Sequence, residues 1–473
     1  MQSEQKKRKR RGAEWGTIVA VGMVFVSGCA HFAGEEDGAV KEVEGQVAMP
    51  ADWEGAVGSG EVEGWLNSFE GQQLEALVEE ALGGNYSLQA ARARLDQAEA
   101  LARIEGAERL PGVSLSGSAR RQETNSGGEP VVRQRSDSFA ASLSVSWEVD
   151  LWGRVRSTAL AAGADFAAAE SDYAAVRLLL VSRVLEAWFV AVERRLQFNL
   201  AEEALRSFES NLTIVEERFR RGLNPALDLR LARANVASAR STYFQNQRLA
   251  DAALRQLEVL LGRYPAGKLE LEARLPTLRG PVQAGLPSTV LARRPDLVAA
   301  RARVMASDAR LRASRLSLLP SLSLTGNVGR SSAELDDLLR DSFDVWSLVG
   351  GISAPLFQGG RLRANVSRAE ARFAETLAGY GEVLLTAFRE VESALASEIY
   401  LREQLSALET AAEESTRALE LAEERYGRGL VDIITVLEAQ RRAFSSRSAV
   451  LGAEAALLTN RLALHLALGG PVN

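Results

Sequence analysis

The sequence predicts an α+β membrane protein, a long α-helical coiled-coil tunnel continuous with a transmembrane β-barrel of 12 strands, four from each of three chains. Three observations predict it. Helical periodicity continues far beyond the three or four turns of an ordinary globular helix. Four short segments alternate apolar residues with serine, which is typical of strands. An internal duplication indicates two tandem structural repeats.

The first long helix is expected from about residue 154 to Gly222, with a return helix to about residue 261. At about 1.5 Å per residue, its first arm would reach roughly 100 Å. Near its far end lies an apolar seam with alternating steps of three and four residues: Leu205, Phe208, Leu212, Val215 and Phe219. Such an arm cannot fold into a compact core, so we expect it to pack along other helices.

The duplication appears in two matched blocks. The segment around Gly222 recurs 207 positions later around Gly429, and residues 85–117 match residues 294–326 with 13 identities in 33 positions. We therefore expect a first repeat at residues 66–264, a linker at 265–287 and a second repeat at 288–473. The second long hairpin then falls at about residues 361–468.

The N-terminus has the three-part plan of a secretory signal peptide. A basic run, Lys6–Arg11, precedes a short apolar stretch that ends in Ser27-Gly28-Cys29. We interpret residues 1–28 as a lipoprotein signal peptide and residues 29–65 as an irregular tether, anchored by a covalent lipid on Cys29. The alternative is a plain signal peptide with a chance cysteine.

Composition excludes several classes of protein. Two histidines and one cysteine are too few for a zinc or copper site, which normally takes three or four such ligands. A net charge of −6 gives no reason to expect nucleic-acid binding. Beyond the signal peptide no stretch has 18 uncharged apolar residues, so no membrane-spanning helix is predicted. We expect no cofactor besides the lipid.

Before the first strands, a short helix is expected at residues 74–82 and a second, capped by Asn85, at about 87–109. Period-two alternation then predicts strands at about residues 113–121, 137–149, 320–330 and 344–357. The charged residues 120–137 are expected to form an exposed hairpin loop. Strands of this length can cross an outer membrane when tilted.

Four strands cannot close a barrel, and open strand edges in lipid leave backbone groups unsatisfied. Three chains would supply twelve strands and an aqueous lumen, whereas eight strands leave an interior filled by side chains. The serine faces would then line water and the apolar faces would meet lipid. Trp147, Trp152 and Trp346 are candidates for the aromatic belt at the membrane interface.

Three motifs carry a resemblance to a known family: Arg-Pro-Asp-Leu at residues 294–297, Pro-Leu-Phe-Gln-Gly-Gly-Arg at 355–361 and Arg-Tyr-x-x-Gly at 425–429. With the doubled order of elements from about residue 66 onward, the chain resembles outer membrane efflux proteins, TolC-like channels, and most closely lipidated OprM-like and NodT-type members. The resemblance implies a passive homotrimeric conduit for small molecules in the outer membrane of a Gram-negative bacterium. Its helices would lie in the periplasm and dock with a periplasmic adaptor (membrane fusion protein) and an inner-membrane pump, for which we expect the RND type.

The resemblance also implies roles for residues near the hairpin tips. Asp228 and Tyr426 match a polar link between coils that closes the periplasmic gate, and Glu438 matches one of two acidic gate positions, with Thr435 at the other. The alternatives are a turn or cap for Asp228 and a solvated helix face for Glu438. The tip residues themselves match the adaptor-docking surface: Gly222, Leu223, Gly429 and Leu430.

An enzyme is not expected, because the sequence has no phosphate-binding glycine loop, nucleophile elbow or ligand cluster. A lone histidine such as His465 on an apolar helix face is more often structural than catalytic. Two other functions stay open. One is a lipid-anchored coiled-coil spacer that conducts nothing, and the other is a duct for type I protein secretion.

Overall fold

The computed structural model describes residues 35–47, 53, 64–69, 73–125, 127–128, 130, 132–280, 284–285, 287–340 and 344–470. These residues are mostly helical and include four antiparallel strands, which confirms that part of the predicted fold class. They group into two compact units. The strand unit comprises the described residues of 1–47, 97–167 and 300–381, and the hairpin unit those of 48–96, 168–299 and 382–473.

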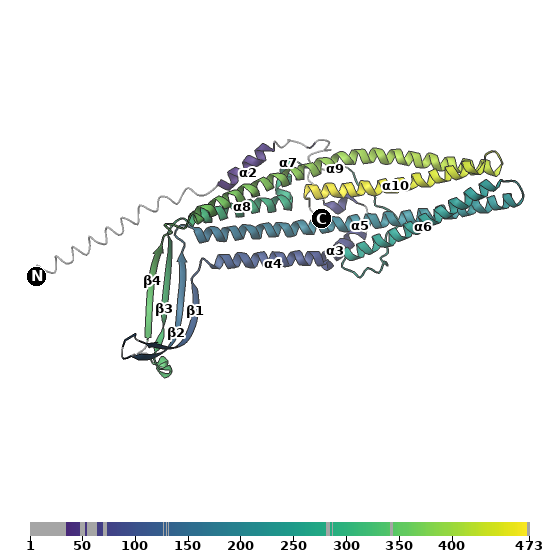
Figure 1. Ribbon diagram of the computed structural model, residues 1–473. Helices are drawn as coiled ribbons and strands as arrows, with labels where there is room; N and C mark the ends of the chain where they lie inside the picture. Colours follow the sequence, from purple (N-terminus) through teal and green to yellow (C-terminus); the bar gives the residue numbers. More distant parts are fainter. Residues whose placement is uncertain are drawn as a thin grey trace. The chain divides into compact units, whose positions relative to one another are not determined.

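Two helices of 67 residues each dominate the chain, and each is followed by a return helix (Figure 1). The helices in chain order are α2 (Glu35–Gln46), η2 (Trp65–Ser68), α3 (Gln73–Gly84), α4 (Tyr86–Ala107), α5 (Arg154–Arg220), α6 (Ala226–Leu260), α7 (Pro287–Arg293), α8 (Pro295–Leu316), η3 (Leu335–Leu339), α9 (Arg361–Gly427) and α10 (Ile433–Leu468). Among the described residues, every helix is too short or too polar to cross a membrane.

Helix α2 lies in a segment expected to be irregular. Two glycines, Gly38 and Gly45, interrupt its weak apolar pattern, so the sequence gives little helical signal. Tertiary contacts hold it instead. Val40 is buried, and the Tyr380 hydroxyl lies 2.6 Å from a Glu44 carboxylate oxygen, to which it donates. The contact joins the start of the chain to α9 within the strand unit.

The four strands form one antiparallel sheet in the order β1-β2-β3-β4 (Figure 1). Their bounds are β1 (Gly112–Asn125), β2 (Arg133–Val149), β3 (Ser321–Ser332) and β4 (Asp344–Ser353). Strand β2 comes from the first repeat and β3 from the second, and eleven residue pairs join them, from Phe139–Ser332 to Val149–Leu322. The sheet therefore joins the two halves of the sequence.

The sheet differs from the prediction at two ends. Strands β1 and β2 continue into the expected loop at residues 120–137, because charged side chains there pair across the strands: Arg121 with Asp137, and Arg135 with Glu123. Strand β4 ends at Ser353 rather than near residue 357, because Pro355 has no N–H to donate to a neighbouring strand.

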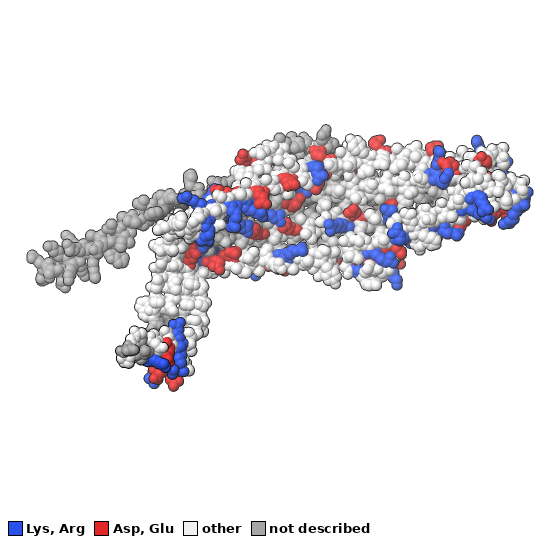
Figure 2. Space-filling model, in the orientation of Figure 1, with Lys and Arg blue, Asp and Glu red and all other residues white. Residues whose placement is uncertain are grey.

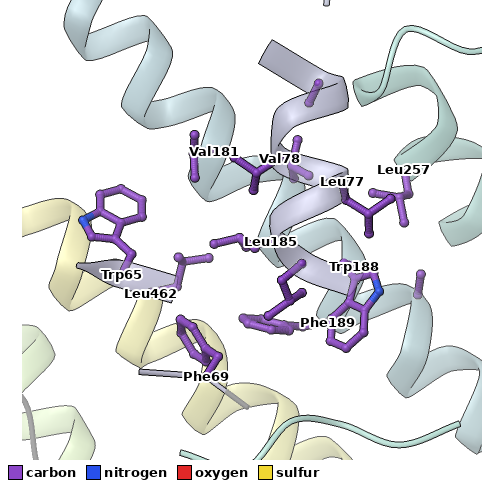
Figure 3. Close-up of a cluster of buried hydrophobic side chains, with 14 of the residues drawn as sticks. Trp65, Phe69, Leu77, Val78, Val181, Leu185, Trp188, Phe189, Leu257 and Leu462 are labelled. Carbon is purple, nitrogen blue, oxygen red and sulfur yellow. The ribbon is translucent and has the colours of Figure 1, made fainter. Parts of the chain in front are cut away.

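The core of the hairpin unit is built from aromatic and branched side chains of α3, α5, α6 and α10 and of the segment around η2 (Figure 3). Trp188 and Phe189 on α5 are fully buried, and Phe189 packs against Phe69 with ring centroids 5.2 Å apart. Leu462 of α10 lies in the same cluster. The core thus combines residues from both repeats.

Two polar side chains buried beside this core, Arg461 and His465, each have a hydrogen-bond partner. Arg461, with no exposed surface, donates to both carboxylate oxygens of Glu398 and to the carbonyl oxygen of Gly280. His465 is also buried, and its Nε2 lies 2.7 Å from the Ser68 hydroxyl. Burial, together with the positive charge of Arg461, lowers the pKa of His465 to about 4, so this ring is neutral at pH 7. These contacts support a structural role for His465.

The Arg-Pro-Asp-Leu motif also has a structural explanation. Pro295 and Asp296 open α8, where a proline needs no partner and a carboxylate favours the helix N-terminus. The buried Arg294 side chain donates to Asp296, to Glu390 on α9 and to the carbonyl oxygen of Ala467 on α10. One arginine therefore fixes three helices of the hairpin unit together.

Candidate functional site

The sheet of the strand unit has one apolar and one polar face. Directly opposed residues on neighbouring strands share a face, and the register places Leu115, Leu143, Val328 and Trp346 in one row across all four strands. The same face carries Val113, Val145, Trp147, Leu322, Leu324, Leu348 and Ile352. The four alternating patterns predicted from sequence therefore combine into one continuous apolar surface.

The opposite face is lined mostly by small polar side chains. It carries Ser114, Ser116, Ser142, Ser144, Ser146, Ser323, Thr325, Asn327 and Ser347, and on β4 also Val345 and Val349. The hydroxyls of Ser114 and Ser144 lie 2.8 Å apart, and those of Ser116 and Ser142 lie 3.0 Å apart. Each hydroxyl keeps further capacity to bind water. This serine face is suited to line an aqueous path.

Charge is absent from the middle of the sheet and present at both ends (Figure 2). The uncharged parts of the strands are residues 112–119, 138–147, 321–329 and 345–353. Beyond them, Arg330 pairs with Asp344 at the loop end, and Arg154 pairs with Glu148 where the helices begin. The sheet thus has an uncharged band bordered by ion pairs.

The three predicted interface tryptophans lie toward the two ends of this band. Trp346, 79% exposed, is two residues from Asp344 at the loop end. Trp147 and Trp152 lie at the helix end, where their ring nitrogens donate to the carbonyl oxygens of Arg109 (3.0 Å) and Pro320 (2.7 Å). Sequence reasoning missed Phe357, which is 89% exposed just after β4. The sequence signal that could have indicated it is the turn Phe357-Gln358-Gly359-Gly360, in which an aromatic residue precedes two glycines.

Both hairpin tips have the same backbone geometry. At the first tip the N–H of Leu223 donates to Arg218 and that of Gly222 to Phe219, and at the second the N–H groups of Leu430 and Gly429 donate to Arg425 and Tyr426. This is the Schellman motif, which needs a left-handed residue. Gly222 (φ 71°) and Gly429 (φ 74°) supply it. The leucine that follows each glycine is exposed at its tip: Leu223 by 65% and Leu430 by 67%.

The structure brings Asp228 and Tyr426 together through a third residue that sequence reasoning missed. The Asn224 side-chain amide lies 2.9 Å from a carboxylate oxygen of Asp228 and 3.3 Å from the Tyr426 hydroxyl, and donates to both. Arg218 covers the Tyr426 ring at 4.6 Å and donates to its carbonyl oxygen. The link therefore joins the two hairpins of one chain.

The residues at the two acidic gate positions, Thr435 and Glu438, contact residues close to them in the sequence. The Thr435 hydroxyl and N–H both donate to Asp432, the N-cap of α10, at 2.8 and 2.9 Å. Glu438 forms ion pairs with Arg441 and Arg442. The hydrogen bond from Arg442, with the charge of Arg441, holds the pKa of Glu438 below its usual value. Both arginines stand three and four residues after Glu438, a spacing visible in the sequence.

The remaining predicted site, the lipidated Cys29, lies outside the described residues. Metal binding was not expected. Across the described part of the chain, no group of three or more histidine, cysteine, aspartate or glutamate side chains is placed to hold a metal ion.

Comparison with known proteins agrees with this geometry. The family model described as outer membrane efflux protein matches residues 77–263 and again 286–470, which supports two tandem halves. The cation efflux system protein CusC of Escherichia coli (strain K12) is 32% identical over 410 residues, covering 86% of this chain and 88% of that protein. The antibiotic efflux pump outer membrane protein ArpC of Pseudomonas putida is 34% identical over 417 residues, covering 86% and 85%.

Solved structures show the same fold. The crystal structure of the CmeC outer membrane channel of Campylobacter jejuni matches with a TM-score of 0.83 at 27% identity, covering 87% of this chain and 89% of that one. The chain therefore belongs to the outer membrane efflux protein family, and it is an outer-membrane channel of an efflux system in a Gram-negative bacterium.

Proposed function

We propose that three copies of this chain join their sheets into one barrel of twelve strands, through which small molecules pass without energy input from the channel. The observation that carries this proposal is the register of the sheet, which collects serine side chains on one face and apolar side chains on the other. A sheet with these two faces separates water from lipid.

The edges of the sheet support the sharing of strands. Strands β1 and β4 each have a single neighbour among the described residues, so each offers a row of backbone groups to another chain. In lipid those groups must be satisfied. The uncharged segments average about nine residues per strand, which span about 30 Å along the strand, or about 23 Å when tilted by 40°. That height is close to the apolar band of about 25 Å in outer-membrane barrels.

The proposed cargo and partners come from the relatives. CusC is named for a cation efflux system and ArpC for an antibiotic efflux pump. We infer that this chain likewise exports drugs, metal ions or other small molecules, and that its hairpins lie in the periplasm. Its partners would be a periplasmic adaptor and an inner-membrane pump of the RND type, with the exposed Leu223 and Leu430 at the docking surface.

Two further roles belong to the same proposal. The covalent lipid on Cys29 anchors the chain to the outer membrane. The contacts of Asn224 with Asp228 and Tyr426 hold the hairpin tips in a closed arrangement. Because Glu438 is paired with two arginines and Thr435 carries no charge, the tip would discriminate weakly in favour of cations.

Single-channel recording tests the conduit. Cys29 is the only cysteine and would be acylated, so an introduced cysteine would be the only free thiol. We expect a sulfonate-bearing methanethiosulfonate reagent to lower the conductance of Ser144→Cys in planar bilayers, because that position faces the lumen. The adjacent Leu143→Cys is the matched control and should be unaffected, because it faces lipid.

Mass measurements complete the test. Native mass spectrometry of the purified protein should show three copies, and the denatured chain should carry a lipid on Cys29. A folded preparation that never conducts would support the coiled-coil spacer instead. Equal block of both cysteine variants would contradict the assignment of the faces.

A further inference from the structure

A cleft lined by four arginines opens in the strand unit between α8, α9 and the start of α5. Its volume is about 760 Å³, and its charged lining residues are Arg303, Arg310, Arg368, Arg372 and Asp165. We call it the arginine cleft. Basic side chains gather over the helix ends next to the strands, as Figure 2 shows. A volume of this size is typical of sites for small ligands.

The arginines come from one face of each helix. On α8, the lining residues Arg303, Ser307, Arg310 and Ser314 are spaced by four, three and four residues, and on α9 Arg368 and Arg372 are spaced by four. Residues at these intervals stack along one side of a helix. Two basic stripes therefore border the same cleft, which concentrates positive potential between its walls.

Two of these arginines form ion pairs within the described part of the chain, and Arg368 does not. Asp165 pairs with Arg310, and Arg372 pairs with Glu375 at 2.7 Å. Arg368 makes no ion pair with any residue that the structure describes. The arginine fork of Arg368 therefore remains available to an anion.

Most of the cleft arginines have no arginine at the equivalent position of the first repeat. At the offset of 209 between the matched blocks, Arg303 corresponds to Arg94, whereas Arg310 corresponds to Leu101. At the offset of 207 between the long helices, Arg368 corresponds to Ala161 and Arg372 to Asp165. The same helical scaffold therefore forms in the first repeat without three of the four arginines, Arg310, Arg368 and Arg372.

We propose that the arginine cleft binds a phosphate group. Planar guanidinium groups donate paired hydrogen bonds to phosphate oxygens, and several of them bordering one cleft match the charge of a phosphate monoester or diester. Two sources can present this chemistry: the headgroup of an anionic phospholipid and a soluble phosphate. The site is built within one chain, so it does not depend on the shared barrel.

Two binding measurements on the full-length protein test the site. Equilibrium dialysis with radiolabelled orthophosphate in an uncharged detergent measures the soluble ligand. Native mass spectrometry after incubation with phosphatidylglycerol or phosphatidylcholine measures lipid adducts. We expect Arg368→Gln/Arg372→Gln to weaken binding at least tenfold, and Arg368→Lys/Arg372→Lys to weaken it less, because lysine keeps the charge and loses the fork.

The matched control is Arg389→Gln/Arg417→Gln, which removes the same charge from α9 outside the cleft and should leave binding unchanged. Saturable orthophosphate binding that the cleft variant loses supports a soluble ligand. Phosphatidylglycerol adducts without orthophosphate binding support a lipid headgroup. The proposal is overturned if the protein binds no orthophosphate and also shows no preference for phosphatidylglycerol over phosphatidylcholine. It is likewise overturned if the control variant loses as much binding as the cleft variant.

Discussion

Asn224 contacts two side chains that hold the hairpin tips together. It donates to the Asp228 carboxylate on its own hairpin and to the Tyr426 hydroxyl on the other. A hydrogen bond to a charged group contributes about 1.5–3 kcal/mol when protected from water, and less where solvent screens it. Because Tyr426 is buried and Asp228 only partly so, we assign the link about 1 kcal/mol per chain.

Removing the acceptor should loosen the tip. We expect Asp228→Ala to raise the open probability of the channel in planar bilayers several-fold, because Asn224 loses the partner that orients its amide toward Tyr426. Asp251→Ala removes a carboxylate from α6 that pairs with Arg255 well away from the tip, and it should leave gating unchanged. Identical recordings from both variants across all voltages would exclude a closing role for this link.

Two residues that sequence reasoning missed at this site, Asn224 and Arg218, share a physical cause. Asn224 and Arg218 contact Tyr426 of the other hairpin, and spacing along the sequence does not show which side chains two hairpins bring together. The sequence does indicate the partners of Glu438, because Arg441 and Arg442 follow it by three and four residues on the same helix. Their effect on its pKa still required the observed hydrogen bonds.

At the scale of elements, regular patterns were predictable and their ends were not. Period-two alternation located all four strands, because one buried or lipid-facing side imposes it on every strand. The ends depend on pairing across strands. Arg121 and Asp137 extend β1 and β2 into an expected loop, while Pro355 cuts β4 short. Helix α2 depends likewise on distant residues such as Tyr380.

The hairpin tips expose a leucine that a partner could bury. Leu430 is 67% exposed at the end of a hydrogen-bonded Schellman turn, so the proposed adaptor could bury it without reorganising the hairpin. We expect Leu430→Asp to reduce site-specific crosslinking to the adaptor in cells at least fivefold. Leu421→Asp, on α9 with 54% exposure, is the matched control and should crosslink normally. Undiminished crosslinking of Leu430→Asp would place the docking surface elsewhere.

Over the whole molecule, the sequence repeats and the compact units do not coincide. Each repeat contributes two strands to the sheet and one hairpin to the other unit. The helix order could be predicted because duplication repeats it. The pairing between the two repeats could not be predicted. Only the register from Phe139–Ser332 to Val149–Leu322 shows that β2 of the first repeat pairs with β3 of the second.

This arrangement predicts that half a chain does not fold. A fragment ending at Gly280 lacks β3 and β4, and it also lacks Leu458 and Leu462 from the core around Trp188. Burying two leucine side chains contributes about 3–6 kcal/mol, a large part of the roughly 5–15 kcal/mol that stabilises a typical domain. We expect this fragment to show no cooperative unfolding transition by circular dichroism.

A nicked chain provides the control. A protease site placed between Gly280 and Ala284 leaves all four strands and both hairpins present, so the cut protein should unfold cooperatively, like the intact one. The pairing of β2 with β3 and the packing of Leu458 and Leu462 in the core around Trp188 hold the pieces together without the covalent link. A cooperative transition in the isolated fragment would show instead that one repeat carries a complete core, contrary to the exchange of partners between the halves.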